Sequence, residues 1–168
     1  MTSMIILGVD PSLRSTGYGV IEVAGNEMRG LAFGEIKNKP SLRQSQCLLR
    51  IHDELRDVIA RERPDTVAIE SIIYVQSTRV AIIMGHARGA AVLAAAAAGL
   101  TIFEYAPRKV KAVVTGLGAA GKMQVGRMVR ALLGLAEVPP PDAADALALA
   151  ICHAQNQRGI VIEPPKQI

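Results

Sequence analysis

Short apolar runs alternate with longer amphipathic segments along the chain. Residues 4–10 (MIILGVD) are continuously apolar up to their last position, which is typical of a strand buried on both faces. Residues 18–23 and 29–36 predict two further strands of a meander, joined by the turn AGNEM. Two more apolar runs, DTVAIE at 65–70 and LTIFEYA at 100–106, predict a fourth and a fifth strand.

Helical periodicity occupies the segments between and after these strands. Residues 41–63 carry apolar side chains at helical spacing opposite a charged face, which predicts an amphipathic surface helix. Residues 78–98 are apolar almost all round and rich in alanine and glycine, which predicts a helix buried on most sides. The alternative is a helix packed on its own copy across a twofold axis. Three shorter helices are expected at 107–114, at 122–133 and from 142 onward.

The order of these elements predicts an α/β fold. Three strands at hairpin spacing, followed by alternating helices and strands, indicate a mixed five-stranded sheet flanked by helices on both faces. The 168 residues fit one domain, expected at 1–157, with a flexible C-terminal tail at 158–168. The apolar run at 89–100 is too short to span a bilayer, and the N-terminus lacks a signal-peptide pattern. We therefore expect a cytoplasmic protein without membrane contact.

Composition and charge refine this picture only slightly. Half of the residues are hydrophobic and a fifth are charged, which is not the composition of a disordered chain. The formal net charge of +4 weakly favours a polyanionic partner. Cys47 and Cys152 lie far apart among apolar residues, so we expect two buried thiols in a reducing compartment. The single histidines are expected to be structural: His52, His86 and His153.

Two of the predicted strands end in a carboxylate. Asp10 ends the first apolar run, and Glu70 ends the fourth. If these strands are parallel central neighbours, both side chains emerge at the same edge of the sheet, where sites lie in open α/β sheets. A carboxylate in such a place is costly to desolvate unless it is paired or bound to a cation.

A second pair of acids, Asp142 and Asp145, opens the last predicted helix in PPPDAADALALA. Helix capping is one explanation, since Asp142 can accept a hydrogen bond from the backbone N–H of Asp145. However, this helix is apolar nearly all round and therefore buried, and positions three apart share a face. Two acids on one face of a buried helix favour a metal site, above all for Asp145.

Four carboxylates from three elements suit a hard cation that prefers oxygen ligands. Mg²⁺ takes few protein carboxylates, keeps waters and completes its shell with substrate phosphate. Two such ions roughly 4 Å apart can activate a water and stabilise the leaving oxygen in phosphodiester cleavage. Zinc is not expected, because the sequence has no cluster of His and Cys.

Residues 105–136 contain no acid but several cations, which would raise affinity for a phosphate backbone. The alternative is an ordinary solvated helix face. This segment also holds the pattern G-x-x-x-x-G-K at 116–122. A phosphate-binding loop is rejected, because Met123 stands where Ser or Thr must hold Mg²⁺ and too little chain follows for a nucleotide domain.

The segments that carry these residues resemble one family. ILGVDPSLRSTGYGVI, VAIES, GHARGAAV, FEYAPRKVKAVVTGLGAAGKMQV and DAADALALAI are similar, in order and at fitting spacing, to the RuvC family of Holliday-junction resolvases. The resemblance covers about residues 4–156. It implies a ribonuclease H-like fold, a homodimer, and two active sites that make paired nicks in opposing strands of a four-way DNA junction with Mg²⁺, or with Mn²⁺ in its place.

The resemblance also assigns roles to residues. The family's four metal-binding catalytic acids match Asp10, Glu70, Asp142 and Asp145, and its two basic catalytic positions match Lys111 and Lys122. These lysines would neutralise phosphate charge near the cut. A function in homologous recombination and DNA repair is implied, with a branch-migration motor complex as a partner.

The chain departs from the family at one position. The family commonly has an aromatic residue three positions after the glutamate, where it stacks on a junction base; here that position is Ile73, and Tyr74 follows it. Either Tyr74 does the stacking or the contact is lost, and Tyr74 as an ordinary loop residue remains an alternative. The complete set of expected DNA contacts is Ile73, Tyr74, Arg79, Arg88, Arg108, Lys109, Lys111, Lys122 and Arg127.

Two other functions stay open from the sequence. The first is a catalytically inactive junction-binding protein, against which the presence of all four acids argues. The second is a nuclease of the same fold that acts on RNA–DNA hybrids or flaps. A monomer in solution would favour this second alternative, because paired cuts need two sites that face one junction.

Overall fold

The computed structural model describes residues 3–73, 75, 77–159 and 164–168. Its strands are β1 (Met4–Asp10), β2 (Ser15–Ala24), β3 (Glu27–Lys37), β4 (Thr66–Glu70), β5 (Thr101–Tyr105) and β6 (Lys166–Gln167). Its helices are α1 (Gln44–Glu62), α2 (Thr78–Ala97), α3 (Pro107–Thr115), α4 (Lys122–Leu133) and α5 (Pro141–Asn156). The predicted strands and helices are therefore confirmed, with ends that differ by a few residues.

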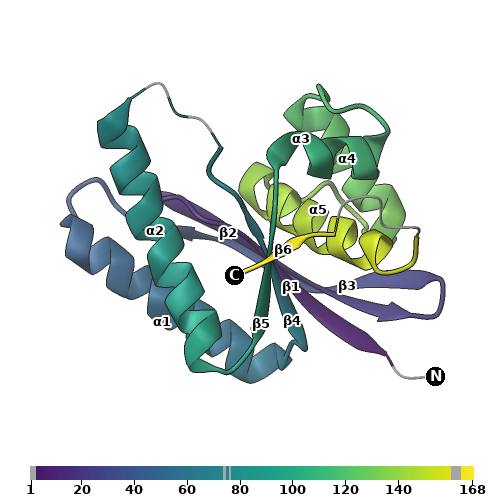
Figure 1. The fold of residues 1–168 in the computed structure, drawn as a ribbon, viewed down its shortest axis with the longest axis horizontal. Coiled ribbons are helices and arrows are strands. Elements are labelled where there is room, and N and C mark those ends of the chain that lie inside the picture. Colours follow the sequence, from purple (N-terminus) through teal and green to yellow (C-terminus); the bar gives the residue numbers. More distant parts are fainter. Residues whose placement is uncertain (1–2, 74, 76, 160–163) are drawn as a thin grey trace.

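The sheet is mixed, with strand order β3-β2-β1-β4-β5-β6. β1 runs antiparallel to β2 and parallel to β4, and β4 runs parallel to β5. Figure 1 shows α1 and α2 on one face of the sheet and α3, α4 and α5 on the other. The expected neighbourhood of β1 and β4 is confirmed, since Val9 is the register partner of Ile69. Asp10 and Glu70 therefore leave the sheet at the same edge.

A sixth strand was not predicted from the sequence. β6 pairs antiparallel with β5, with Glu104 opposite Lys166, and these two side chains form an ion pair of 3.1 Å. The last residues of the segment expected as a flexible tail, 158–168, thus extend the five-stranded sheet to six strands. Two residues carry no periodicity, so only tertiary pairing defines this strand. Residues 160–163 of that segment lie outside the described residues.

The closest approach between layers is that of α5 to the sheet. A Cβ added to Gly8 would lie 1.9 Å from the backbone oxygen of Ala146, and one added to Gly17 would lie 1.9 Å from that of Asp142. Real Cβ atoms do not come so close to a backbone oxygen, so the helix rests directly on the main chain of β1 and β2. This contact fixes the distance between the first turn of α5 and the end of β1.

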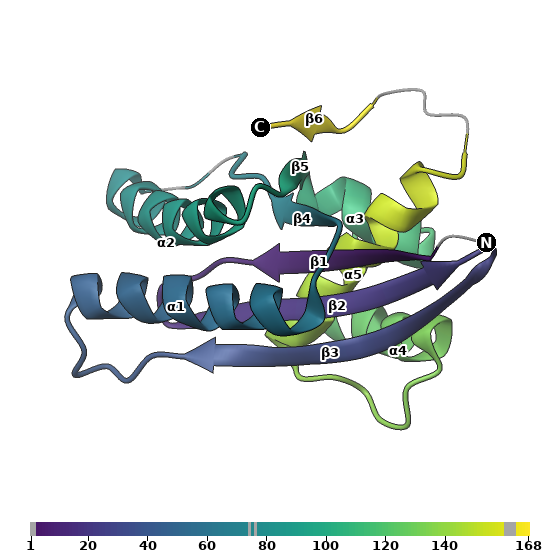
Figure 2. The ribbon, with the colours of Figure 1, turned by 90° about the horizontal axis from the view of Figure 1, so that it is seen from below.

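The prediction that the helix at 78–98 is buried on most sides is wrong for the single chain. In α2 the buried residues are four alanines: Ala87, Ala91, Ala94 and Ala95. Val80, Ile82 and Leu93 are 48%, 54% and 61% exposed. The fully buried side chains are thus all small, and Val92 is partly buried against the same core, whereas several of the larger apolar side chains face outward. Figure 2 shows α2 lying beside α1 on one face of the sheet.

By length and composition alone, α2 could also cross a membrane. Its 20 residues have a mean hydropathy of 1.6 in the most apolar window. Its alanine stripe packs into the core that α1 and the sheet share. The alternative drawn from the sequence, in which a second copy packs on this helix, stays a prediction.

The substitution Gly8→Ala is expected to destabilise the protein by about 1–3 kcal/mol, because α5 must move away from β1 to admit a methyl group. Urea unfolding measures this loss. Gly85→Ala is the matched control, since apart from its chain neighbours and the adjacent backbone of its own helix no atom of the described residues lies within 4 Å of the added Cβ. Equal unfolding midpoints for the two variants would contradict the contact.

Candidate metal centre

Four carboxylates meet at one end of the sheet. Asp10 ends β1 and Glu70 ends β4, whereas Asp142 and Asp145 lie in the first two turns of α5. Carboxylate oxygens of Asp10, Asp142 and Asp145 lie within 4.8 Å of one another. Glu70 joins Asp10 and Asp145 in the lining of a cavity of about 280 Å³. The sequence analysis expected these residues to gather, and the structure brings them together.

The cluster is electrostatically unfavourable when every acid is ionised. Burial raises the pKa of Asp10 to about 8, and the charges of Glu70 and Asp145 add to the effect. Burial is also the main cause that raises the pKa of Glu70 and that of Asp145. Their oxygens have lost water and face like charges, so a cation bound among them would relieve both costs.

Two lysines face the acids. The Nζ of Lys122 lies 4.0 Å from Oδ1 of Asp142 and 3.9 Å from Oδ2 of Asp145, while 68% of its side chain stays exposed. Lys111 lines the same cavity from α3, and both lysines act to lower the pKa of Glu70. Two cations offset only part of the charge of four carboxylates. Oxygen donors in excess of nearby cations are what Mg²⁺ sites provide.

Side chains from the meander hold Asp142 in place. The hydroxyl of Ser15 donates a hydrogen bond of 2.5 Å to Oδ2 of Asp142, and the backbone N–H of Asp142 donates to Oε1 of Glu35 at 3.1 Å. A hydrogen bond from Lys37 is the main cause of the lowered pKa of Glu35. Glu35 therefore remains ionised and satisfies an N–H at the start of α5.

The capping explanation for Asp142 is wrong. The N-cap of α5 is Pro140 and not Asp142, and this end of the helix has no side-chain capping hydrogen bond among the described residues. Asp142 lies within the helix. Its carboxylate accepts a hydrogen bond from Ser15, and its backbone N–H donates one to Glu35. Sequence reasoning missed both supports, because they stand 127 and 107 residues away in the chain and no local pattern marks them.

The expected DNA contacts divide into exposed and internal residues. Ile73 is 65% exposed, and Arg79, Arg108 and Arg127 are exposed as well. Lys109 is half-buried, and its Nζ lies 5.9 Å from the centre of the Tyr105 ring. Tyr74 lies outside the described residues.

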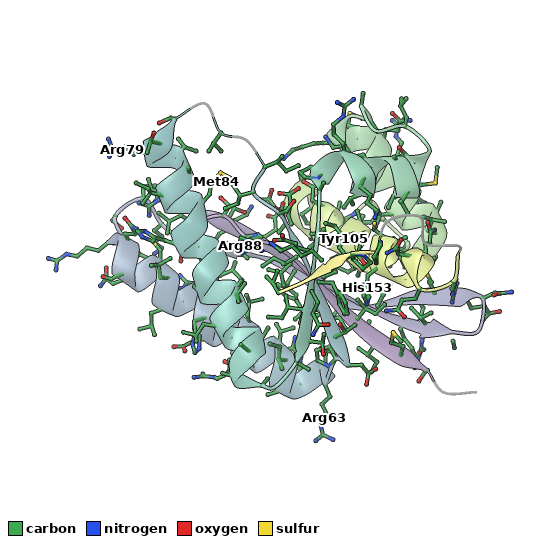
Figure 3. All side chains as sticks on the ribbon, in the orientation of Figure 1. Arg63, Arg79, Met84, Arg88, Tyr105 and His153 are labelled. Carbon is green, nitrogen blue, oxygen red and sulfur yellow. The ribbon has the colours of Figure 1, made fainter. Side chains whose placement is uncertain are left out.

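Arg88 does not face solvent as an exposed DNA contact would. Its guanidinium donates to Oε2 of Glu104 at 2.5 Å and to the backbone oxygen of Glu70 at 3.3 Å. Figure 3 shows Arg79 at the outer end of α2 and Arg88 over the middle of the molecule. The sequence could not distinguish the two, because both are arginines of one helix.

The cysteines and histidines lie apart from the acids. Cys47 and Cys152 are buried thiols, as expected. His153 is fully buried, bonds to the hydroxyl of Tyr105 at 2.7 Å, and has its pKa lowered to about 4 by burial. His52 and His86 line a hollow between α1 and α2. No histidine joins the carboxylate group found among the described residues.

Comparison with known proteins gives a single result. The family described as "Crossover junction endodeoxyribonuclease RuvC" matches residues 6–153. The RuvC of Pelotomaculum thermopropionicum is 48% identical over 154 residues, 91% of this chain and 94% of that protein. The RuvC of Akkermansia muciniphila is 51% identical over 150 residues, 89% of this chain and 90% of that protein.

A solved structure agrees with these sequence matches. Thermus thermophilus RuvC in complex with Holliday junction substrate superposes with a TM-score of 0.89 and 35% identity. The match covers 98% of this chain and 99% of that one. The fold expected from the sequence is therefore confirmed, with its mixed sheet between two layers of helices.

Without metal, the stability of the protein is expected to fall as the pH rises. The pKa of Asp10 is 3.8 when unfolded and about 8 when folded, so the folded state binds the extra proton between these values. The resulting stabilisation is complete below about pH 4 and is lost as the pH approaches 8. Asp10→Asn should reduce this slope to the part that Glu70 and Asp145 contribute, and it should be more stable than wild type at pH 8 by at least about 1.4 kcal/mol.

Urea unfolding in a chelator between pH 4 and pH 8.5 measures this effect. Asp57→Asn is the control, because the Asp57 side chain is 67% exposed on α1. A profile of Asp10→Asn that runs parallel to that of wild type would contradict the proposed burial cost.

Proposed function

The chain belongs to the RuvC family of crossover junction endodeoxyribonucleases, and we propose from this how its residues carry out the family's reaction. It is a metal-dependent, structure-specific DNA endonuclease that resolves Holliday junctions in recombination and repair. The observation that carries the residue roles is the meeting of Asp10, Glu70 and Asp145 with two lysines in one hollow at the end of β1 and β4. The fourth acid, Asp142, lies beside this hollow, with a carboxylate oxygen within 4.8 Å of those of Asp10 and Asp145. Cleavage proceeds by paired, symmetric nicks in opposing strands.

The four acids Asp10, Glu70, Asp142 and Asp145 bind the metal, which we take to be Mg²⁺, two ions at each site, replaceable by Mn²⁺. Three observations support this donor set: the oxygens lie close together, burial raises the pKa of three of the acids, and the nearby lysines are too few to neutralise them. When bound, the ions would polarise the scissile phosphate and increase the acidity of the attacking water.

The lysines act on the substrate phosphate. Lys122 reaches the acids from the first turn of α4 with most of its side chain in solvent, so it can turn towards a phosphate that enters the hollow. Lys111 lies on the other wall. Both would offset the negative charge that grows on the phosphate during cleavage. The basic character of α3 and α4 is then part of the DNA surface and not only a solvated face.

DNA would cross the acids along a continuous depression. A second hollow shares Asp10, Glu70 and Lys122 with the first. It is also lined by Asp142 and extends to α2 at Val80, Ile83 and Met84. A strand laid along both hollows would contact Ile73 on one side and the basic helices, with Arg108, Lys109 and Arg127, on the other. Arg79 completes the contacts proposed on the α2 side, and Tyr74, also expected to contact DNA, lies outside the described residues.

Two facing active sites require two copies of the chain, and α2 offers the surface. Its outer apolar side chains are exposed, and a hollow of about 510 Å³ runs between α1 and α2. The lining of this hollow is mostly apolar: Leu48, Leu49, His52, His86, Gly89, Ala90 and Leu93. We place the homodimer contact here, since a large exposed apolar patch marks an interaction surface. The branch-migration motor as a partner, and a cytoplasmic location, rest on the family alone.

Glu70→Gln is expected to reduce junction cleavage by about 100-fold or more, while junction binding in Ca²⁺ stays intact or tightens because one negative charge is lost. The assay uses a synthetic four-way junction beside linear duplex and an RNA–DNA hybrid, each with Mg²⁺ and with Ca²⁺. Glu54→Gln is the control, because Glu54 is 54% exposed on α1.

Each alternative function has its own outcome in this assay. Cleavage by Glu70→Gln at the wild-type rate would contradict the role of the acids. Tight junction binding by wild type without any cut would indicate an inactive binding protein. Cleavage of the hybrid would indicate a different substrate for the same site.

Leu93→Glu is expected to weaken the homodimer at least tenfold, since a buried, unpaired carboxylate in an apolar contact costs more than about 1.4 kcal/mol. Sedimentation at micromolar concentration measures the mass, and the junction assay should show the loss of symmetric nicks. Leu117→Glu is the control for mass, because Leu117 is 53% exposed on the loop between α3 and α4. An unchanged dimer in Leu93→Glu would contradict the proposed surface.

A further inference from the structure

Glu70 is the last residue of β4 that pairs with the neighbouring strand β5. Glu70 is the register partner of Tyr105, and the N–H of Ser71 donates to the backbone oxygen of Tyr105 at 2.9 Å. Of the residues between there and the start of α2 at Thr78, those that the structure describes (71–73, 75 and 77) belong to no helix or strand. The proposed metal ligand therefore stands at the end of a regular strand.

The side chain of Arg88, from α2, contacts the end of β4 at Glu70. The Nε of Arg88 donates to the backbone oxygen of Glu70 at 3.3 Å, and its Nη2 donates to Oε2 of Glu104 at 2.5 Å. The two side chains are largely shielded, with 21% of Arg88 and 17% of Glu104 exposed. The second carboxylate oxygen of Glu104 takes the ion pair with Lys166. The guanidinium of Arg88 on α2 thus contacts β4 and β5, and Lys166 of β6 contacts the same Glu104 carboxylate.

A guanidinium suits this position because its donors form a rigid, planar fork. When Glu104 fixes one side of the fork, the Nε–H on the other side has a defined direction, and that direction is the Glu70 carbonyl. The peptide that follows the Glu70 side chain is then held by α2 as well as by β5. A fixed peptide fixes the Cα–Cβ direction of Glu70 and hence the reach of its carboxylate.

We propose that Arg88, oriented by Glu104, is a positioning residue for Glu70: it anchors the end of β4 so that the Glu70 carboxylate meets Asp10 and Asp145 at the metal site. This inference rests on the proposed role of Glu70 as a metal ligand. It assigns Arg88 a role different from the DNA contact expected from the sequence, because its charge is already paired with Glu104. Partners that orient metal ligands affect metal affinity without touching the metal.

The test separates metal binding from DNA binding and from cleavage. Arg88→Gln is expected to reduce both the turnover number on a four-way junction and the affinity for Mn²⁺ measured by calorimetry without DNA, each by about 10- to 100-fold. KM, and junction affinity in Ca²⁺, should stay close to wild type. Arg63→Gln is the matched control: it removes one arginine charge from an exposed position at the C-terminal end of α1. Arg63 precedes the start of β4, whereas Glu70 ends that strand, and Figure 3 shows Arg63 well apart from Arg88.

Two further variants probe the same pair. Arg88→Lys keeps the charge but lacks the fork, so it should restore only part of the metal affinity. Glu104→Gln should lower metal affinity in the same direction as Arg88→Gln, and the double variant should be no worse than Arg88→Gln alone, because the two residues act through one contact. If Arg88→Gln does not fold, Arg88→Lys and Glu104→Gln carry the test.

Several results would overturn the proposal. Weaker junction binding by Arg88→Gln with an unchanged turnover number would make Arg88 a DNA contact. Wild-type Mn²⁺ affinity in both Arg88→Lys and Glu104→Gln would contradict the proposal that this pair positions Glu70. A failure of the proposed function would look different. Cleavage by Glu70→Gln at the wild-type rate would contradict the role of Glu70 itself. An inactive Glu70→Gln, together with wild-type Mn²⁺ affinity in Arg88→Lys and Glu104→Gln, would overturn only the role of Arg88.

Discussion

The contact between α5 and the bare backbone of β1 and β2 is the constraint on which the site depends. Because Gly8 and Gly17 have no side chain, the helix lies directly on the sheet, and its first turns reach the end of β1. A helix held one side chain further away would separate Asp142 and Asp145 from Asp10 by more than a shared cation can span. The apolar remainder of α5 stabilises this approach, since it is buried from Ala146 to Ala154.

Holding like charges together costs stability that other parts of the fold must offset. The acids gain little from one another, and burial disfavours their ionised forms. The neighbouring polar groups do not neutralise the charge of the four acids; they fix the position of the helix that carries two of them. Ser15 and Glu35 fix the start of α5, and the Lys122 amine remains in solvent, near enough to reduce repulsion but without closing the hollow. A cation bound among the acids would reduce the repulsion between them.

The parts of the site that the sequence predicted are those with a local cause. Asp10 and Glu70 follow apolar strands, and strand order alone brings such ends together. Ser15 and the Arg88–Glu104 pair were beyond prediction, since their partners are set by tertiary contacts between distant elements. The burial of α2 was mispredicted for a related reason: an all-apolar helix favours burial, but periodicity does not say which of its side chains the rest of the chain contacts. β6 was too short to carry any pattern.

The short strand β6 has a consequence for solubility. β5 would otherwise end the sheet as an edge with unpaired N–H and C=O groups, and such edges template aggregation between chains. The backbone of 166–168 covers this edge, with the Ile168 N–H donating to the oxygen of Ile102 at 3.0 Å, and the Lys166 ammonium adds charge there. A truncation or a fusion that pulls these residues away would expose the sequence TIFEY to other chains. Residues 166–168 thus protect the edge of β5 from pairing with strands of other chains.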